Sequence, residues 1–294
     1  KGVPLWSAGG NWQVDKESFY HVEWLDNLKL RMSYGRQGNI DRSVTAYLTA
    51  RSFSRNIYGD PYANLTNPPN PSLRWEKSNV FNSGLDFTML GNLLNGSLDF
   101  YVKNASDLIG NSPIAPQTGL NSFRGNVANM ETKGIDVNIT GNWVKQEFNW
   151  TTNFIYSYVK DKITKYEVEQ TTNYSYMQRN YVNPYEGYPY SALFSFPFLG
   201  LDGEGNPLGL VDGQPSADYG ALINMTGIEN MVYHGSQVPT HFGSIRNTFG
   251  YKNFIFSFNI TFKAGYYYRR SSLNNGNLYQ DVPIAGIADY ASRW

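Results

Sequence analysis

Few residues of this chain have the types and spacing that metal binding would need. The clearest candidate is the run Asp202-Gly203-Glu204-Gly205-Asn206, in which oxygen-bearing side chains alternate as they do at the start of a calcium loop. An EF-hand loop requires Gly at its sixth position and Glu at its twelfth, but Pro207 and Gly213 stand there. The run is better explained as a turn-rich loop, and we expect no metal or cofactor.

The histidines and paired carboxylates do not suggest catalysis either. His21, His234 and His241 lack the spacing of metal ligands. Glu167 and Glu169 lie two residues apart, which on a strand or loop gives a shared solvated face more readily than a glycosidase pair. The sequence contains no nucleophile elbow, phosphate-binding loop or dinucleotide fingerprint. We therefore expect a protein without enzymatic activity.

The residues best suited to contact a ligand are tyrosines in one long polar stretch. Aromatic faces stack on sugar rings, and the Tyr hydroxyl adds a hydrogen-bonding group. The alternative is that these tyrosines only pack their loop against neighbouring loops or the rim of the fold. The candidates for contact with a substrate or a covering lid are Tyr174, Tyr176, Tyr181, Tyr185, Tyr188 and Tyr190.

Composition narrows the class of protein. The 24 basic and 24 acidic residues balance, so the chain has no electrostatic footprint for nucleic acid. Aromatic residues make up 16% of the chain although its mean hydropathy is −0.46, which is unusual for a soluble enzyme. The absence of Cys excludes disulfides and Cys-ligated metals. No apolar run approaches the roughly 18–20 residues of a spanning helix.

β-Strands must position these residues, because apolar side chains recur at every second position. In Phe254–Phe262, Phe and Ile alternate with Ser, Asn and Thr, so one face is apolar and the other is mostly polar. The same pattern predicts four hairpins. Their strands are roughly residues 11–20 with 27–36, 82–89 with 94–103, 135–143 with 148–158, and 244–251 with 254–262.

Short turns within the hairpins alternate with long polar stretches between them. The turns are 90–93, 144–147 and 252–253, and the long stretches are 37–75, 104–130 and 161–240. A transmembrane β-barrel has this layout, with short periplasmic turns, long extracellular loops and tilted strands of about 9–11 residues. A soluble β-sandwich or propeller is the alternative, but sandwich strands are typically about 5–6 residues.

In a membrane barrel the alternation also fixes which residues meet lipid and which face the lumen. The positions expected on the lipid face are Leu85, Phe87, Leu98, Phe100, Ile135, Val137, Ile139, Phe154, Tyr156, Phe256, Phe258 and Ile260. The positions expected on the lumen face are Asp86, Asp99, Asp136, Asn138, Asn149, Asn259 and Thr261.

Several blocks of the chain resemble the SusC/RagA family of TonB-linked outer-membrane transporters of Bacteroidetes. Two examples are NPSLRWEKSNVFNSGLDF, starting at Asn70, and GNVANMETKGIDVNI, starting at Gly125. Others are GGNWQVDKESF from Gly9, LDNLKLRMSYGRQGN from Leu25 and the run from Tyr233 to Gly265. These blocks follow the order of the family and leave mainly loops unmatched.

The resemblance implies a barrel of about 22 strands with an internal plug, located in the bacterial outer membrane. It also implies import of oligosaccharides or peptides, with a SusD-like lipoprotein as an external lid and the TonB–ExbB–ExbD complex as the energy source. The plug motifs do not occur here, and the start is not a signal peptide. We therefore expect residues 1–294 to be one part of the barrel domain, truncated at both ends.

The predicted fold class is thus all-β, an open part of a transmembrane antiparallel barrel. Active nutrient import is the leading function. A passive porin or a structural or adhesin barrel is the alternative, and a hydrolase is disfavoured by the missing catalytic set. An open sheet of about eight to ten strands is expected, with two unpaired edges.

Overall fold

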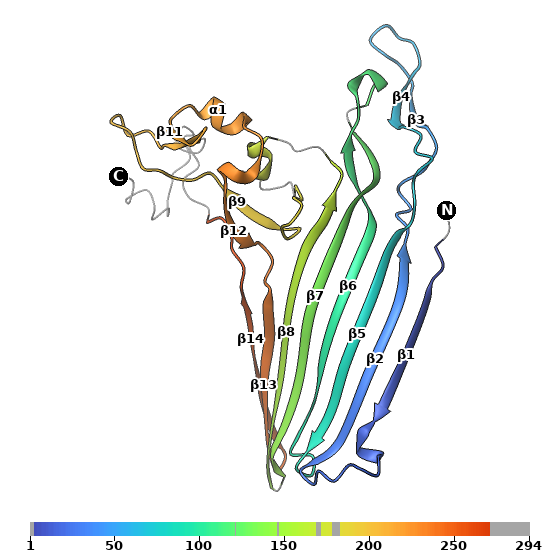
Figure 1. Ribbon diagram of the computed structural model, residues 1–294, viewed down its shortest axis with the longest axis vertical. Coiled ribbons are helices and arrows are strands. Elements are labelled where there is room, and N and C mark those ends of the chain that lie inside the picture. The colour runs from blue at the N-terminus through green and yellow to red at the C-terminus, as the bar shows by residue number, and fades with distance from the viewer. Residues whose placement is uncertain (1–2, 121, 146, 169–171, 178–182, 271–294) are drawn as a thin grey trace.

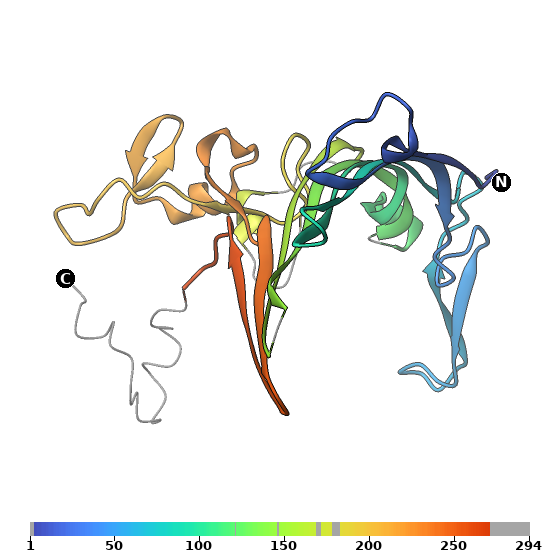
Figure 2. The ribbon, with the colours of Figure 1, turned by 90° about the horizontal axis from the view of Figure 1, so that it is seen from below.

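The main feature of the computed structural model is one curved antiparallel sheet (Figures 1 and 2). The structure describes residues 3–120, 122–145, 147–168, 172–177 and 183–270. Eight strands of this part form the sheet in the order β1-β2-β5-β6-β7-β8-β13-β14. They are β1 (Trp6–Gln13), β2 (Leu25–Asn39), β5 (Glu76–Met89), β6 (Leu94–Pro113), β7 (Ser122–Lys145), β8 (Phe148–Tyr166), β13 (His241–Tyr251) and β14 (Phe254–Ala264). Among the described residues β1 and β14 are the edges, so the predicted open sheet is confirmed.

The predicted short turns at 90–93 and 252–253 are confirmed, whereas the turn predicted at 144–147 is shorter, because β7 continues to Lys145 and β8 begins at Phe148. These strand ends all lie at one end of the sheet, which we call the short-turn end (Figure 1). In the β5–β6 turn Leu90, Gly91 and Asn92 all have positive φ angles. The Asp26 carboxylate accepts hydrogen bonds from the amides of Gly91 (2.7 Å) and Asn92 (3.3 Å). These bonds offset the left-handed backbone, which costs free energy for residues other than Gly.

Several predicted boundaries are wrong. The stretch predicted as a loop from residue 161 begins later, because β8 continues to Tyr166. Residues 104–130 are not a long loop, because β6 continues to Pro113 and β7 begins at Ser122. The polar composition misled the prediction, because backbone hydrogen bonds pair the two strands without a regular alternation of apolar residues. The first hairpin also differs, because β1 ends at Gln13 and Val14–Lys16 forms a 3-10 helix.

The opposite end, which we call the loop end, carries the other small elements of the described residues. A hairpin of β3 (Thr49–Phe53) and β4 (Tyr62–Asn67) lies between β2 and β5 in sequence. The described residues of 172–238 form what we call the loop lobe. Its elements are η3 (Asn173–Met177), β9 (Ala192–Ser195), β10 (Gly209–Val211), β11 (Gln214–Ser216), α1 (Tyr219–Asn224), η4 (Ile228–Asn230) and β12 (Val232–Ser236). None of the helices in the described ranges is both long and apolar enough to cross a membrane.

Strand register separates the two faces of the sheet as predicted. Leu98 pairs with Leu85 and Val137, and Val137 pairs with Tyr156, so the apolar positions of four strands share one face, which we call the apolar face. The opposite, polar face carries Asp86, Asp99 and Asp136. On the apolar face Phe256 is 63% exposed and Ile260 58% exposed.

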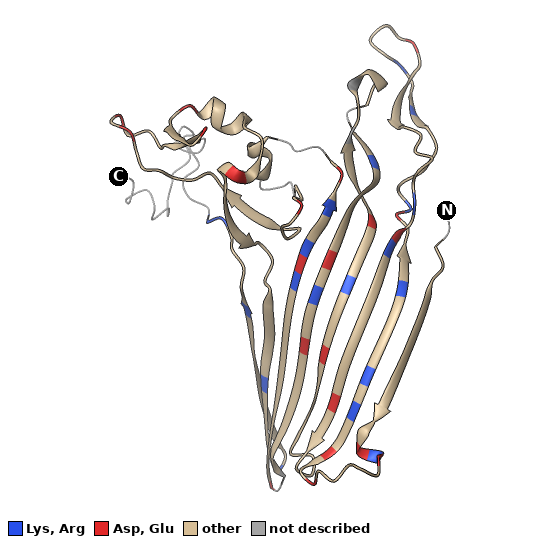
Figure 3. Cartoon of the chain, in the orientation of Figure 1, with Lys and Arg blue, Asp and Glu red and all other residues tan. Residues whose placement is uncertain are grey.

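Acidic and basic residues lie on neighbouring strands of the sheet (Figure 3), and on the polar face some of them pair across strands. The Arg31 guanidinium donates two hydrogen bonds of 2.8 Å to the Asp86 carboxylate and lies 2.9 Å from Asp99 Oδ1. Gly84 is opposite both Arg31 and Asp99 in the register, and its missing side chain leaves room for the guanidinium. A bidentate arginine pair of this kind is stronger than a single charged contact.

Polar groups on the apolar face satisfy one another. The Trp143 indole donates to Thr152 Oγ1 (2.9 Å), and both the Thr152 hydroxyl and the Trp150 indole donate to Asn247 Oδ1. Trp150 also stacks against Phe249 with ring centroids 5.8 Å apart. This belt lies near the short-turn end, where aromatic girdles occur in membrane barrels.

Two glycines of the apolar face allow unusually close strand contact. Phe262 is opposite Gly243 in the register, and a Cβ added to Gly243 would lie 2.9 Å from the Phe262 ring and would clash with the Ile155 carbonyl oxygen. Gly96, opposite Phe87, would clash in the same way with the Asn138 carbonyl. In both places the aromatic ring covers a position where the backbone has no side chain.

Candidate functional site

The loop lobe is hydrogen-bonded to the part of β8 near the loop end. Pairing between β8 and β13 ends near Thr240, whose carbonyl accepts a hydrogen bond from the Val159 amide (2.9 Å). Beyond this point the lobe pairs with β8, since the Ile163 amide donates to the Tyr188 carbonyl and the Gly187 amide donates to the Ile163 carbonyl, both at 2.8 Å. The Tyr190 amide donates to the Asp161 carboxylate (2.7 Å). The main chain therefore fixes residues 187–190 against the sheet.

The six predicted tyrosines have different environments. Tyr176 and Tyr188 each pack edge-to-face with both Tyr185 and Phe194, with ring centroids 5.2–6.0 Å apart. Tyr174 and Tyr190 are half exposed, at 50% and 49%. Tyr181 lies outside the described residues. Packing thus explains three of the candidates, and Tyr174 and Tyr190 are the described ones open to a ligand.

The centre of this aromatic cluster is Phe194, which is only 2% exposed. Tyr233 completes the cluster, 4.9 Å from Tyr188 between ring centroids. Burial raises the pKa of the Tyr233 hydroxyl, and the negative charge of Asp161 raises it further. The hydroxyl therefore stays protonated at neutral pH and can donate hydrogen bonds.

Arg269, which follows β14, ties the cluster together. Its guanidinium donates to the carbonyls of Phe194 (2.6 Å), Tyr176 (3.3 Å) and Met177. The amide of Tyr267 donates to the Ser236 carbonyl (2.8 Å), so the same segment also contacts β12. Charge-assisted hydrogen bonds to backbone carbonyls are stronger than neutral ones, so Arg269 holds segments distant in sequence together.

A cavity of about 750 Å³ lies between the lobe and the loop end of the sheet. On β8 the alternation that places Ser157 on the polar face continues through Val159, Asp161 and Ile163, which line the cavity. Tyr190 and Val238 line it from the lobe side. Its size is within the usual range of ligand sites. The cavity is therefore a candidate binding site on the polar face of the sheet.

Two β-bulges shape the wall of this cavity. The register of β6 and β7 shifts between Ala105 and Leu108 and again between Leu108 and Ile109. As a result the consecutive residues Leu108 and Ile109, and likewise Val127 and Ala128, line the same cavity. Regular alternation would have turned every second one away.

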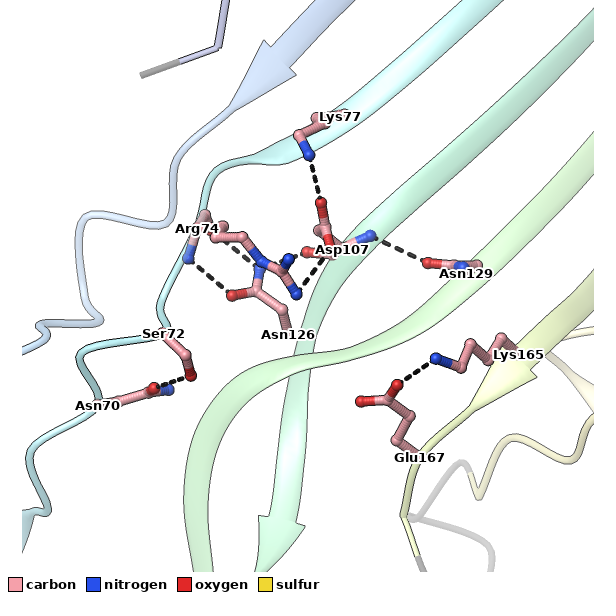
Figure 4. A network of polar contacts seen from close by, with 9 residues as sticks. All are labelled: Asn70, Ser72, Arg74, Lys77, Asp107, Asn126, Asn129, Lys165 and Glu167. Carbon is pink, nitrogen blue, oxygen red and sulfur yellow. Dashed lines mark hydrogen bonds and ion pairs between the residues drawn. The ribbon is translucent and has the colours of Figure 1, made fainter. Parts of the chain in front are cut away.

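A polar network around Asp107 fixes the first bulge (Figure 4). Asp107 has a φ angle of +59°, and its carboxylate lies 2.7 Å from Lys77 Nζ and 3.2 Å from Arg74 Nη2. The Asn129 side chain accepts a hydrogen bond from the Asp107 amide (3.0 Å). Asn126 bonds both main-chain groups of Arg74, which holds the segment entering β5 against β6 and β7.

Substituting Asp107 should loosen this junction without unfolding the sheet. Asp107→Asn tolerates the left-handed backbone but removes the charge, and we expect a loss of roughly 1 kcal/mol, since Arg74 and Lys77 are partly exposed. Asp107→Ala should cause a larger loss of stability, because alanine also disfavours the left-handed backbone conformation of this residue. Hydrogen exchange of residues 70–77 measures the effect. Equal protection in both variants and the parent would contradict the assigned role.

The predicted calcium-like run is a hydrogen-bonded turn. The Asp202 carboxylate accepts hydrogen bonds from the amides of Glu204 (2.9 Å) and Asn206 (2.8 Å) and from the Asn206 side chain (2.9 Å). The Asn206 bonds, then that of Glu204, lower the Asp202 pKa. The carboxylate is thus occupied by its own loop, and no cluster of three metal-ligating residues occurs among the described side chains.

Asp202→Ala should increase hydrogen exchange in residues 200–208 several-fold, whereas Glu204→Ala in the same loop should not. Because the Asp202 pKa is lower in the folded protein than in the unfolded chain, its contribution is complete above the ordinary aspartate pKa. The contribution is lost as pH falls through the lowered value. Protease sensitivity of the parent loop should therefore appear only in acid below about pH 4, and loosening already at pH 6 would contradict the assignment.

The histidines lie apart. His21 contacts the Phe19 carbonyl, His234 contacts Ser195 Oγ (2.7 Å), and His241 contacts the Tyr156 hydroxyl (2.8 Å). Glu167 forms an ion pair with Lys165, while Glu169 lies outside the described residues. Each described group thus has a separate structural partner.

Sequence reasoning missed the wall of the cavity. Leu108-Ile109 and Val127-Ala128 are apolar doublets within a stretch read as a polar loop. Such doublets break the period-two pattern and are a signal of a bulge. Nothing in the local sequence indicated the role of Arg269, because its partners are more than 70 residues away.

The sheet has one apolar and one polar face, with short turns at one end and long loops at the other. These features place it in the class of membrane β-barrel sheets. The chain belongs to the TonB-dependent receptor-like β-barrel family, whose sequence profile matches residues 1–280.

Comparisons with individual proteins agree with this assignment. TonB-dependent receptor P3 of Formosa agariphila is 28% identical over 86% of this chain, and TonB-dependent receptor SusC of Bacteroides thetaiotaomicron is 26% identical over 90%. The chain spans 27% of the length of each. The solved structure of the RagAB peptide transporter has the same fold, with a TM-score of 0.72 and 23% identity over 89% of this chain and 29% of that one.

Proposed function

We propose that this chain supplies strands and loops to an outer-membrane barrel that actively imports oligosaccharides or peptides. The observation that carries the proposal is the family match over residues 1–280 on a sheet with one apolar and one polar face. The apolar face meets lipid, and the polar face lines the lumen. The short-turn end is periplasmic, and the loop end is outside the cell.

The loop end is then where nutrient arrives and where a SusD-like lipoprotein closes over the barrel. The RagAB neighbour is described as a peptide transporter, and SusC is a TonB-dependent receptor, which supports import coupled to TonB–ExbB–ExbD. The protein performs no chemistry on its cargo. It binds, orients and releases it.

The alternative, a passive porin or structural barrel, differs in its need for energy. If import is active, growth on the cognate nutrient should stop in a strain without TonB and uptake should stop on adding an uncoupler. Surface amounts of the protein should not change. Uptake that persists at low nutrient concentration without TonB would favour the porin.

The exposed tyrosines give a sharper test of the loop lobe than deletion of residues 173–190, which would also remove buried Asn173 and the packed Tyr188. Tyr190→Ala should reduce uptake several-fold at normal surface expression, because Tyr190 lines the cavity. Tyr188→Ala should instead lower expression, since it removes packing from the aromatic cluster. Normal uptake by a variant that carries both Tyr174→Ala and Tyr190→Ala would show that these two tyrosines do not contact the ligand.

A further inference from the structure

The cavity beneath the loop lobe has a chemistry that discriminates between the two substrate classes. Its wall toward the sheet carries polar residues such as Glu76, Asn111 and Asp161 together with six aliphatic side chains. The aliphatic residues are Leu108, Ile109, Val127, Ala128, Val159 and Ile163. Sugar hydroxyls lose hydrogen bonds with water when they enter such a surface, and each unreplaced bond opposes binding. Apolar amino-acid side chains have no such requirement.

The charged groups of the lining already have partners. The Glu76 carboxylate accepts hydrogen bonds from the Ile109 amide (2.8 Å) and from Asn39 (2.7 Å). Arg124 pairs with Asp41 (2.8 Å) and donates to Ser43 Oγ (2.9 Å). The Asp161 carboxylate accepts the Tyr190 amide. A ligand with many hydroxyls would have to break these contacts to gain hydrogen bonds from the charged groups. The buried Asn183 side-chain nitrogen, which also lines the cavity, has no hydrogen-bond partner among the described residues and can bind one acceptor.

The Arg124–Asp41 pair is held by its surroundings as well. The Ser43 hydroxyl and amide both donate to Asp41, and these bonds, with the charge of Arg124, lower the Asp41 pKa. The carboxylate thus stays ionised and stays paired. Arg124 lines the cavity, and this pair together with Ser43 holds its guanidinium.

The doubled bulge is what concentrates apolar surface here. Two pairs of consecutive residues on β6 and β7 face the cavity, and the Asp107 network of Figure 4 holds the first bulge in place. A backbone conformation that costs free energy, kept by two ion pairs, is typical of a functional position. The network therefore keeps these aliphatic side chains in the pocket, where strict alternation would turn every second one away.

We infer that this cavity binds an apolar side chain of an extended peptide, and that the cargo is peptide rather than glycan. The inference rests on the proposed import function and deepens it by naming the substrate class. Tyr190 and Val238 form the mouth of the pocket, with exposed fractions of 49% and 54%. The aliphatic residues of the wall form its floor.

The test measures binding by isothermal titration calorimetry to the full-length gene product in detergent. The probes are a hexapeptide with Leu-Phe at its centre, the same peptide with Ser-Ser there, and maltohexaose. We expect the Leu-Phe peptide to bind at least about tenfold more tightly than the other two. Equal affinity for the two peptides, or tighter binding of maltohexaose, would overturn the inference.

Two variants at the mouth locate the site. Val238→Trp should obstruct the pocket and weaken the Leu-Phe peptide by about tenfold or more, and Val238→Ser should reduce the preference over the Ser-Ser peptide. Val232→Trp is the matched control, because Val232 is also exposed on the lobe (40%) but does not line the cavity. Equal effects of Val238→Trp and Val232→Trp would also overturn the inference.

The growth assay separates this inference from the proposed function. If growth on a defined nutrient depends on TonB but the binding assay shows no preference for the Leu-Phe peptide, only the pocket assignment is refuted. Absence of both TonB-dependent growth and binding of any probe refutes both proposals.

Discussion

Replacing Val137 by arginine is expected to destabilise the membrane-inserted protein by about 2–4 kcal/mol. Val137 lies on the apolar face, paired with Leu98 on one side and Tyr156 on the other. If this face meets lipid, the guanidinium has no water or counter-charge at that depth. Guanidinium unfolding in lipid vesicles measures the loss, and the heat-modifiable band on a gel reports assembly in the outer membrane.

The neighbouring position supplies the control. Asn138 points to the polar face and accepts one hydrogen bond from Asn153 (2.9 Å), so Asn138→Arg should cost roughly 1 kcal/mol or less. A lumen tolerates the added charge because water reaches it. If the two arginine variants were equally stable, the assignment of the apolar face to lipid would be wrong.

Gly243→Ala is expected to destabilise the sheet by roughly 1–3 kcal/mol, the range of an overpacked site. The added methyl group would meet the Ile155 carbonyl of β8 and the Phe262 ring of β14, and the carbonyl cannot move without breaking the strand ladder. Denaturant unfolding of the inserted protein should show the loss as a lower midpoint.

Gly250→Ala is the matched control on the same strand. The nearest atoms to its added Cβ are in Asn149, at 3.7 Å or more, which is ordinary van der Waals distance. This variant should match the parent or gain up to about 1 kcal/mol, because alanine restricts the unfolded chain. A larger loss at Gly250 than at Gly243 would show that close strand approach is not what selects glycine.

The alternation of apolar and polar residues was enough to predict the strands near the short-turn end, except in the first hairpin, where β1 ends at Gln13. In those strands apolar and polar residues alternate over most positions. A two-residue turn such as Lys252-Asn253 also fixes which residues of the two strands are opposite one another. Prediction failed between 104 and 130, where both faces of the β6–β7 ribbon carry polar residues and period-two hydrophobicity disappears. Strand pairing there depends on the partner strand, which local sequence does not reveal.

The candidate site was predicted only in part, for the same reason. The aromatic density of 174–190 indicated the lobe, but it did not distinguish Tyr188, which packs against Phe194, from the half-exposed Tyr190. That difference arises from contacts between residues far apart in sequence. The cavity wall depends on two bulges, and a bulge changes which side of the sheet a side chain occupies without changing its type.

The long β6–β7 ribbon has a mechanical consequence. It runs to Pro113 and Ser122, well past the point where β5 begins at Glu76 (Figure 1). Its outer part is braced from one side, because the Ile109 amide bonds to Glu76 and Arg124 pairs with Asp41. A load on the tip is therefore carried into the segment that leads from β2 to β5 as well as into the bulge at Asp107, and a braced beam of this kind bends less than a free one.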